Sequence, residues 1–386
     1  MFKALSKSAR HFATAVLLLL LLLVLAEIGL RLNAPPQTMT VTTASPGHLQ
    51  PLLVPSATTH HEMVRLATVT CSSGVSIQTN SLGLRGDRPA AQTPAGTRRI
   101  LVLGDETVLG PQLSDEETVP ARLQQLLARN GVTAEVINGG VPGYSPLLSW
   151  LLFQHELERL RPDVVILHFD MTDVADDAAY RPALKSEGDE RVCCHAVLQA
   201  APRTNHSLLT TLRSSAVVSR LQDLTGLSGA ADTADRNWLR ERYRWTAASG
   251  PDLKLLVKHA LEPVELFERA AREQGFELLL VTSPVPWQVA AADDFPQLSK
   301  TIAINGSWPI TQDLPQRILS MLSEKNSIRF CDATDAFRAF SQPAKLYLED
   351  DRMLSRLGAA LYARELAGQI LSLKFAETGG QNATMH

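Results

Sequence analysis

The sequence predicts an α/β protein with a three-layer, doubly wound parallel sheet. Short apolar runs, which suit strands buried on both faces, alternate along the chain with longer segments of helical periodicity. Glycine and acidic residues follow directly after several of these runs, as they do at the strand ends of an open parallel sheet. We therefore expect a five-strand sheet of order 2-1-3-4-5, with any chemistry at the carboxyl ends of its strands.

The elements follow one another in a regular order. The first strand is the apolar run Ile100–Leu103, which Gly104 ends. A capping box at Ser114–Glu117 then predicts the start of a helix. Beyond it, strands are expected at 134–137, 164–169, 277–282 and 328–331, and helices at 146–159, 252–274, 315–325 and 355–373.

Composition excludes some classes of function. The chain has 386 residues and a formal net charge of -3, with no basic stripe, so we expect no nucleic-acid partner. No two of the four cysteines form a C-x-x-C pair, which argues against a thiolate metal site, and we expect no cofactor and no bound metal. A long-range disulfide stays open. The cysteines are Cys71, Cys193, Cys194 and Cys331.

The N-terminus predicts a membrane anchor. The segment Phe12–Leu30 is apolar except for Glu27, and as a helix it would be about 28 Å long, close to the thickness of a bilayer core. Basic residues precede it, so residues 1–11 should be cytoplasmic and the main domain periplasmic or on the cell surface. The alternative is a signal peptide cleaved after Ala26. We prefer the anchor because apolar residues continue beyond Glu27 and Arg31 closes the segment.

The rest of the chain divides by composition. Residues 31–79 are expected to form an extracytoplasmic stalk in which His60 and His61 are solvated, because this stretch is rich in Pro, Thr and Ser. The domain should span 80–375, with an insertion at 176–250, and 376–386 should be a disordered polar tail. The densest part of the insertion, Trp238–Trp245, is expected to be a peripheral helix that buries its aromatic residues, and the alternatives are a segment that caps the site or one that binds a partner.

The segment Arg99–Gly110, RILVLGDETVLG, resembles the first block of the SGNH (GDSL) hydrolase superfamily, which reads Gly-Asp-Ser with serine as nucleophile. Here Glu106 occupies the serine position. A lead-in, Asn80–Arg85, is similar to that of membrane-anchored members. The resemblance covers most of the chain after residue 80 and implies a flavodoxin-like fold.

The other blocks of the superfamily follow in the expected order. Val141–Ser145 resembles the second block and places Gly143 on the glycine that donates its N–H to the oxyanion. The third block, which usually reads Gly-x-Asn-Asp, is here Asp170-Met-Thr-Asp173, so Thr172 replaces the amide donor. The last block keeps the orienting acid as Asp351 but has Met353 where the family has its histidine base.

These substitutions imply that the serine mechanism is lost, since methionine cannot accept a proton and a carboxylate beside an oxyanion opposes its formation. The resemblance then implies an impaired catalyst that acts as a binding or structural protein of the cell envelope, with an acylated or acetylated glycan as one candidate ligand. The alternative is an ester hydrolase whose carboxylate cluster acts as acid and base or holds a cation. The cluster consists of Asp105, Glu106, Asp170, Asp173 and Asp351.

Two further alternatives concern other residues. An active serine could lie elsewhere, at Ser145 or Ser283, but neither has a histidine partner that the sequence identifies. His168, on the third strand, could be a displaced base, although a core or rim position is the expectation for a lone histidine there.

Overall fold

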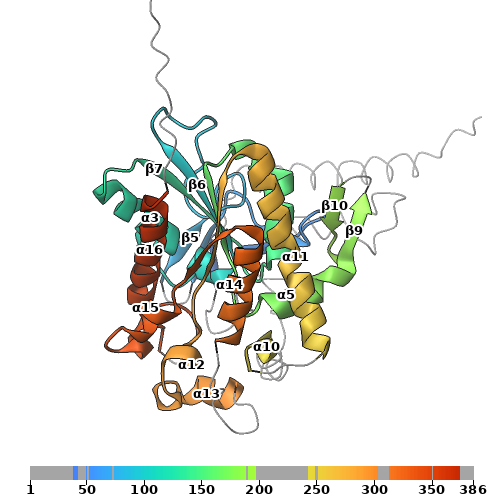
Figure 1. Ribbon diagram of the computed structural model, residues 1–386. Helices are drawn as coiled ribbons and strands as arrows, with labels where there is room; N and C mark the ends of the chain where they lie inside the picture. Colours follow the sequence, from blue (N-terminus) through green and yellow to red (C-terminus); the bar gives the residue numbers. More distant parts are fainter. Residues whose placement is uncertain are drawn as a thin grey trace, which may run out of the picture. The chain divides into compact units, whose positions relative to one another are not determined.

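The computed structural model describes residues 38–41, 49, 52–71, 74–187, 190–196, 242–247, 251–302, 313–349 and 351–373 (Figure 1). All of them belong to one compact unit of the chain. The predicted membrane segment 12–30 and the predicted tail 376–386 lie outside the described residues. Within the described residues, no helix has the length and apolar character that crossing a membrane requires.

The centre of the unit is a five-stranded parallel sheet of order β12-β11-β8-β6-β7. In chain order this is 2-1-3-4-5, so the predicted topology is confirmed. The strands are β6 (Arg98–Gly104), β7 (Ala134–Gly140), β8 (Val164–His168), β11 (Glu277–Thr282) and β12 (Arg329–Asp332).

Helices cover both faces of this sheet. On one face α3 packs against α16, and on the other α11 packs against α4 and α5 (Figure 1). The helices in chain order are α2 (Glu106–Leu109), α3 (Val119–Arg129), α4 (Pro146–Leu152), α5 (Asp173–Tyr180), α10 (Arg244–Ala247), α11 (Pro251–Gln274), α12 (Pro286–Val289), α13 (Pro296–Ile302), α14 (Leu314–Asn326), α15 (Thr334–Arg338) and α16 (Arg356–Leu371). Short 3-10 turns lie at 115–117, 158–160, 181–183, 292–294 and 343–346, and a π-helical turn at 153–157 extends α4.

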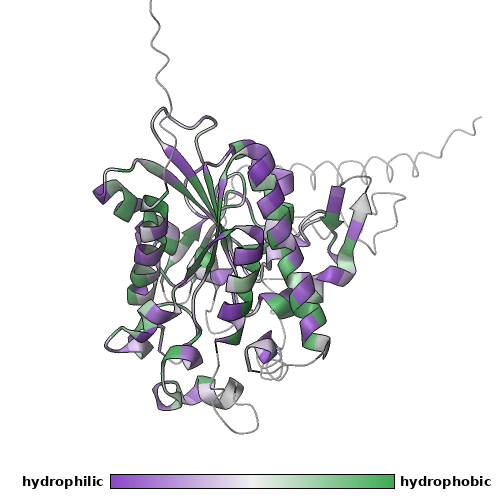
Figure 2. Cartoon of the chain, viewed as in Figure 1, coloured by the Kyte–Doolittle hydropathy of each residue, from purple (hydrophilic) through white to green (hydrophobic). Residues whose placement is uncertain are grey.

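Burial explains why the strands form. Every residue of β8 is buried, and so is β6 after its first residue, which is the pattern of strands covered on both faces. The hydropathy colouring shows the apolar residues gathered along the central strands and the polar ones on the outer faces of the helices (Figure 2). The main core therefore lies between the sheet and its two helical layers.

The start of α3 differs from the prediction. Ser114 forms no side-chain capping bond, and Asp115–Glu117 is only a 3-10 turn. The helix begins at Val119, where the Thr118 hydroxyl accepts a hydrogen bond from the Ala121 N–H. Pro120 explains the shift, because a proline is tolerated only in the first turn of a helix.

The predicted stalk is wrong for residues 52–79. This stretch folds onto the domain as β2 (Leu53–Pro55), β3 (His61–Met63), β4 (Thr68–Cys71) and β5 (Ser76–Gln78), and β1 (Thr38–Val41) pairs with β4. Leu52, Val69 and Ile77 are fully buried in a small second core. The strands are short, so their alternation of apolar and polar residues is hidden among the surrounding Thr and Ser residues. The composition of this stretch therefore resembles that of a linker.

The lead-in Asn80–Arg85 has a structural role. The buried Arg85 guanidinium donates to the carbonyls of Leu109 and Leu113 and pairs with Asp115 at 2.7 Å. Gly83 adopts φ +75°, and a Cβ there would lie 2.8 Å from a backbone carbonyl. The segment thus fixes the end of α2 and the loop that follows it.

The predicted insertion is described only in part. After α5 the chain forms a hairpin of β9 (Leu184–Glu187) and β10 (Glu190–Cys193), and residues 242–247 return to the domain. All four cysteines are free, so the disulfide left open by the sequence is not formed.

Candidate functional site

The candidate site lies where β6, β7 and β8 end. Asp105 and Glu106 follow β6, the loop 141–145 follows β7, and residues 170–173 follow β8. β6 is flanked by β7 and β8 in parallel register, so the three loops meet at one edge of the sheet. The structure therefore brings together three of the four blocks on which the family resemblance rests.

Glu106 is the first residue of α2, and its side chain is 2% exposed. Neither carboxylate oxygen has a hydrogen-bond partner among the described residues. Its position is fixed from both sides, because Asp105 caps the helix through the Thr107 N–H and Gly140 lies against the next turn. A Cβ at Gly140 would come within 2.3 Å of the Leu109 nitrogen, so α2 can approach β7 only at a glycine.

Asp105 and Asp170 form a coupled pair of buried carboxyl groups. Burial raises the pKa of Asp105 well above its ordinary value, and the charges of Asp170 and Glu106 add to the effect. Burial acts in the same direction on Asp170, but His168, Arg352 and two hydrogen bonds from Thr172 lower its pKa. Asp170 therefore ionises first, and Asp105 holds a proton more strongly than an ordinary aspartic acid.

Thr172 stands at the position of the oxyanion amide but is already engaged. Its N–H and its hydroxyl both donate to Oδ1 of Asp170 at 2.9 Å, and the residue is fully buried. The other Asp170 oxygen accepts from the Thr107 hydroxyl at 3.3 Å. Thr172 is thus turned toward a carboxylate and offers no donor to a substrate oxygen.

Gly143 has a left-handed backbone conformation that favours glycine. It has φ +70°, and a Cβ there would lie 3.2 Å from the Tyr180 hydroxyl oxygen. The loop is supported by the N-terminal segment: Nε2 of His61 lies 2.9 Å from the Pro142 carbonyl, and the Tyr144 hydroxyl donates to the His61 carbonyl at 2.6 Å. His61 is 7% exposed, so the expectation of a solvated histidine is wrong.

The last block reaches the site through Arg352 rather than through Asp351. Oδ1 of Asp351 accepts from the backbone N–H groups of Arg352 and Met353, so it orders its own turn. Partial burial acts to lower the pKa of Arg352, but Tyr243, Glu106 and the two aspartates raise it above its ordinary value. Arg352 is therefore a cation that acts electrostatically on the carboxylate cluster.

A second group of charges comes from a segment that the sequence left undecided. Arg242 pairs with Asp176, and both side chains are at most 10% exposed. Trp245 donates its indole N–H to the Met171 carbonyl at 2.6 Å. Residues 242–245 thus pack on the third block, with Tyr243 and Trp245 buried, and the rest of the predicted segment, 238–241, lies outside the described residues. The signal was the mixture of arginine and aromatic residues.

Asp173 completes the cluster. It is 1% exposed, and its Oδ2 accepts the Asp170 N–H at 2.8 Å. Burial, together with Asp105 and Asp170, raises its pKa well above the ordinary value. Asp105, Glu106, Asp170 and Asp173 therefore gather as the sequence predicted, whereas the carboxylate of Asp351 serves its own loop.

Of the two serine alternatives, only Ser283 lies beside a histidine. Ser145 Oγ is buried without a hydrogen bond among the described residues. Ser283 Oγ lies 3.3 Å from Nε2 of His168. However, the imidazole of His168 is only 2% exposed at the end of β8, and this burial lowers its pKa to about 4. His168 is a core residue, as expected, although it also borders Asp105.

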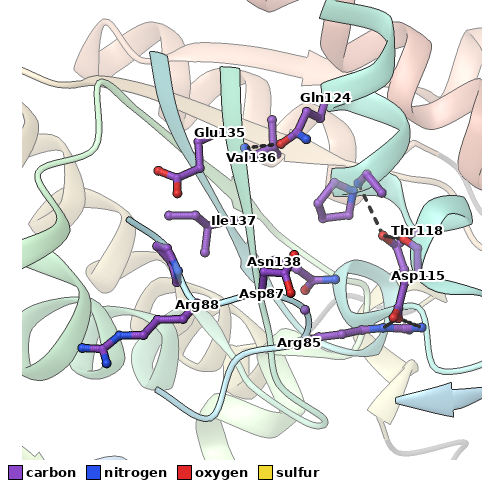
Figure 3. A pocket seen from close by; sticks show the side chains of 14 residues that line it. Arg85, Asp87, Arg88, Asp115, Thr118, Gln124, Glu135, Val136, Ile137 and Asn138 are labelled. Atoms are coloured by element: carbon purple, nitrogen blue, oxygen red, sulfur yellow. Dashed lines mark hydrogen bonds and ion pairs between the residues drawn. The ribbon is translucent and has the colours of Figure 1, made fainter. Parts of the chain in front are cut away.

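A separate pocket of about 400 Å³ lies beside the edge strand β7 (Figure 3). The lead-in forms one wall, and α3 and β7 form the others. The Arg85 guanidinium is already engaged in the contacts described above. Arg88 is exposed, and its side chain points away from the pocket (Figure 3). This pocket shares no residue with the carboxylate cluster.

Comparisons with known proteins give structural neighbours only. No family model matches the sequence, and no curated protein is similar to it. An acetylxylan esterase from Geobacillus stearothermophilus has 11% identity and a TM-score of 0.40, with 75% of this chain and 99% of that chain covered. A lipase/acylhydrolase from Enterococcus faecalis has 14% identity and a TM-score of 0.34, with coverages of 70% and 96%. With TM-scores below 0.5, these similarities decide neither the family nor the reaction of this chain.

Proposed function

We propose that the protein is a membrane-anchored, extracytoplasmic binding protein with an SGNH-hydrolase-like fold, in which the former catalytic site holds a ligand without cleaving it by the serine mechanism. The observation that carries the proposal is Glu106. It stands at the nucleophile position, buried, with both carboxylate oxygens free of partners among the described residues. A buried acceptor of this kind is costly unless a ligand group satisfies it.

The other parts of the hydrolase machinery support the same function. Thr172 donates to Asp170 and not toward a substrate, and Met353 cannot serve as a base. Asp170 places negative charge where an oxyanion would develop. Each of these changes alone lowers acyl transfer by orders of magnitude, and together they remove nucleophile, base and one donor.

The ligand class follows from the groups that remain. Glu106 accepts hydrogen bonds, Arg352 supplies a cation, and Gly143 retains a backbone N–H in an oxyanion-type loop. A glycan that carries acyl or acetyl groups offers hydroxyl donors for the carboxylate and a carbonyl for the N–H. We therefore propose such a glycan of the cell envelope as the ligand.

The test uses the full-length chain in detergent, since residues 52–79 are part of the domain. Turnover of an aryl acetate by the wild type should equal that of the matched variant Glu106→Ala. Calorimetric titration with O-acetylated glycan fragments of the cell envelope should show binding that Glu106→Ala weakens at least tenfold. Absence of binding to this glycan class, or binding indifferent to Glu106→Ala, would refute the proposal.

The anchor is tested separately. A periplasmic-type reporter fused after residue 40 should be active outside the cytoplasm, because the basic N-terminus keeps residues 1–11 inside. Activity of the fusion only in the cytoplasm would exclude the proposed topology and leave the binding site unaffected.

A second candidate is an ester hydrolase that works with carboxyl groups. The raised pKa of Asp105 beside the lowered pKa of Asp170 favours it, since such a pair can supply an acid and a base. Turnover by the wild type well above that of Glu106→Ala would select this function over binding.

A further inference from the structure

Two aspartates and one histidine converge at the ends of β6 and β8. Asp105, His168 and Asp170 each offer one ligand atom, and these atoms all lie within 4.8 Å of one another. The side chains are 1%, 2% and 6% exposed. The arrangement is set by the sheet, because β6 and β8 are paired and end together, at Gly104 and His168.

The imidazole of His168 has one nitrogen, Nδ1, without a hydrogen-bond partner among the described residues. Nε2 lies 3.3 Å from the Ser283 hydroxyl, and Nδ1 is buried without a hydrogen bond. Nδ1 lies 3.8 Å from Oδ1 of Asp105, too far for a hydrogen bond. If Nε2 carries the proton, the Nδ1 lone pair faces a carboxylate; if Nδ1 carries it, the N–H has no acceptor. Either tautomer leaves a buried polar atom unsatisfied.

The carboxylates also lack a full counter-charge. Oδ2 of Asp105 and both oxygens of Glu106 are buried and have no partner in the described part of the chain. Arg352 acts on them electrostatically, but no described ion pair within 4.0 Å joins its guanidinium to any of them. A cation held between Asp105 and Asp170 would satisfy the free oxygen and neutralise the cluster.

The geometry points to a divalent cation site formed by a carboxylate oxygen of Asp105, Nδ1 of His168 and a carboxylate oxygen of Asp170. One imidazole and two carboxylates suit Zn²⁺ or Mn²⁺ better than Mg²⁺ or Ca²⁺, which prefer oxygen alone. The contact from Nε2 to Ser283 matches the outer hydrogen bond that orients ligating histidines. The site is argued independently of the proposed glycan.

Metal binding tests the site directly. The full-length chain in detergent is freed of metal with a chelator and titrated calorimetrically with Zn²⁺ and, separately, Mn²⁺. We expect one equivalent to bind, and we expect His168→Gln and Asp105→Asn each to weaken binding at least tenfold. Asp332→Asn is the matched control, because this aspartate ends β12 at the same edge of the sheet and is occupied by Thr334.

A second histidine cluster requires its own control. The rings of His60 and His195 have centroids 4.5 Å apart, and Nδ1 of His60 lies 3.0 Å from Nδ1 of His61. Binding that is lost in His60→Gln and kept in His168→Gln would overturn the proposal. So would the absence of binding by the wild type at millimolar metal.

A spectroscopic measurement does not depend on the variants folding. Co²⁺ in place of Zn²⁺ should give the visible absorption of a site with mixed nitrogen and oxygen ligands, and X-ray absorption of the Zn²⁺ form should show one imidazole. A first shell with no imidazole would exclude the site. Because neither readout uses a glycan or an ester, a negative result here leaves the proposed function untouched.

Discussion

The hydroxyl of Thr172 donates its hydrogen bond to Oδ1 of Asp170 over 2.9 Å. At this point in an SGNH hydrolase an amide would face the substrate oxygen. Here the donor is held by a carboxylate two residues earlier in the chain, which itself stands where a small neutral residue is expected. The two substitutions therefore act together, and restoring one without the other leaves the donor occupied.

This relationship predicts an order of recovery. The triple variant Glu106→Ser, Thr172→Asn, Met353→His should show little ester hydrolysis, because Asp170 still attracts the new amide. Adding Asp170→Gly should raise kcat/KM for an aryl acetate at least tenfold, since one oxyanion donor contributes about 10²–10³ in rate. Equal turnover by the triple and quadruple variants would contradict the role given to Asp170.

Glu106 should lower the stability of the folded protein. Glu106→Gln replaces a buried carboxyl group without a hydrogen-bond partner by a neutral amide, so we expect the free energy of unfolding to rise by about 1 kcal/mol in the presence of a chelator. Glu135→Gln is the contrasting control, because Glu135 pairs with the buried Arg99 at 2.7 Å. Loss of this ion pair in Glu135→Gln should lower the free energy of unfolding by about 2 kcal/mol. Thermal unfolding measures both, and a Glu106→Gln protein less stable than the wild type would contradict the argument.

Arg85 should not be replaceable by lysine. Its guanidinium donates to several carbonyls behind α2 at once, a pattern that a single ammonium group cannot reproduce. We expect Arg85→Lys to destabilise the protein by about 2 kcal/mol, while Arg88→Lys, at an exposed position three residues after the lead-in, changes the stability by less than about 0.5 kcal/mol. Urea unfolding of the two variants provides the comparison, and equal effects would remove the structural role assigned to Arg85.

The histidines near the Gly143 loop should make the fold sensitive to acid. Burial, with His61 and His195, lowers the pKa of His60 from 6.5 to about 4. Between these values the unfolded chain binds more protons than the folded one, so stability is lost as the pH falls from about 6.5 to about 4. One such group gives at most about 1.4 kcal/mol per pH unit, and less here because the ring is partly exposed.

His60→Gln should therefore reduce the difference in melting temperature between pH 7 and pH 5. A part of the difference should remain, because burial also lowers the pKa of His61 and His168. His259→Gln, on α11, serves as the control. An unchanged pH dependence in His60→Gln would show that this ring does not titrate as described.

The sequence by itself determined the sheet and its order. Apolar runs such as Ile100–Leu103 and Val164–Phe169 are short enough for strands buried on both faces, and their alternation with helices, together with the order of the family-like blocks, predicted the observed strand order. It also located the ends of β6 and β8 as the site, since polar residues directly after buried strands gather at one edge. These are local patterns, and local patterns are readable in a sequence.

Tertiary structure alone decided which side chains meet there. His61 and Arg242 are far from Glu106 in the chain, and nothing in their spacing predicts that Glu106 acts electrostatically on both of them. The short strands of 52–79 gain their stability from packing on the domain and not from their own propensity, so composition made them look like a linker. The role of a buried charge such as Glu106 depends on which partners surround it, and only the folded chain supplies or withholds those partners.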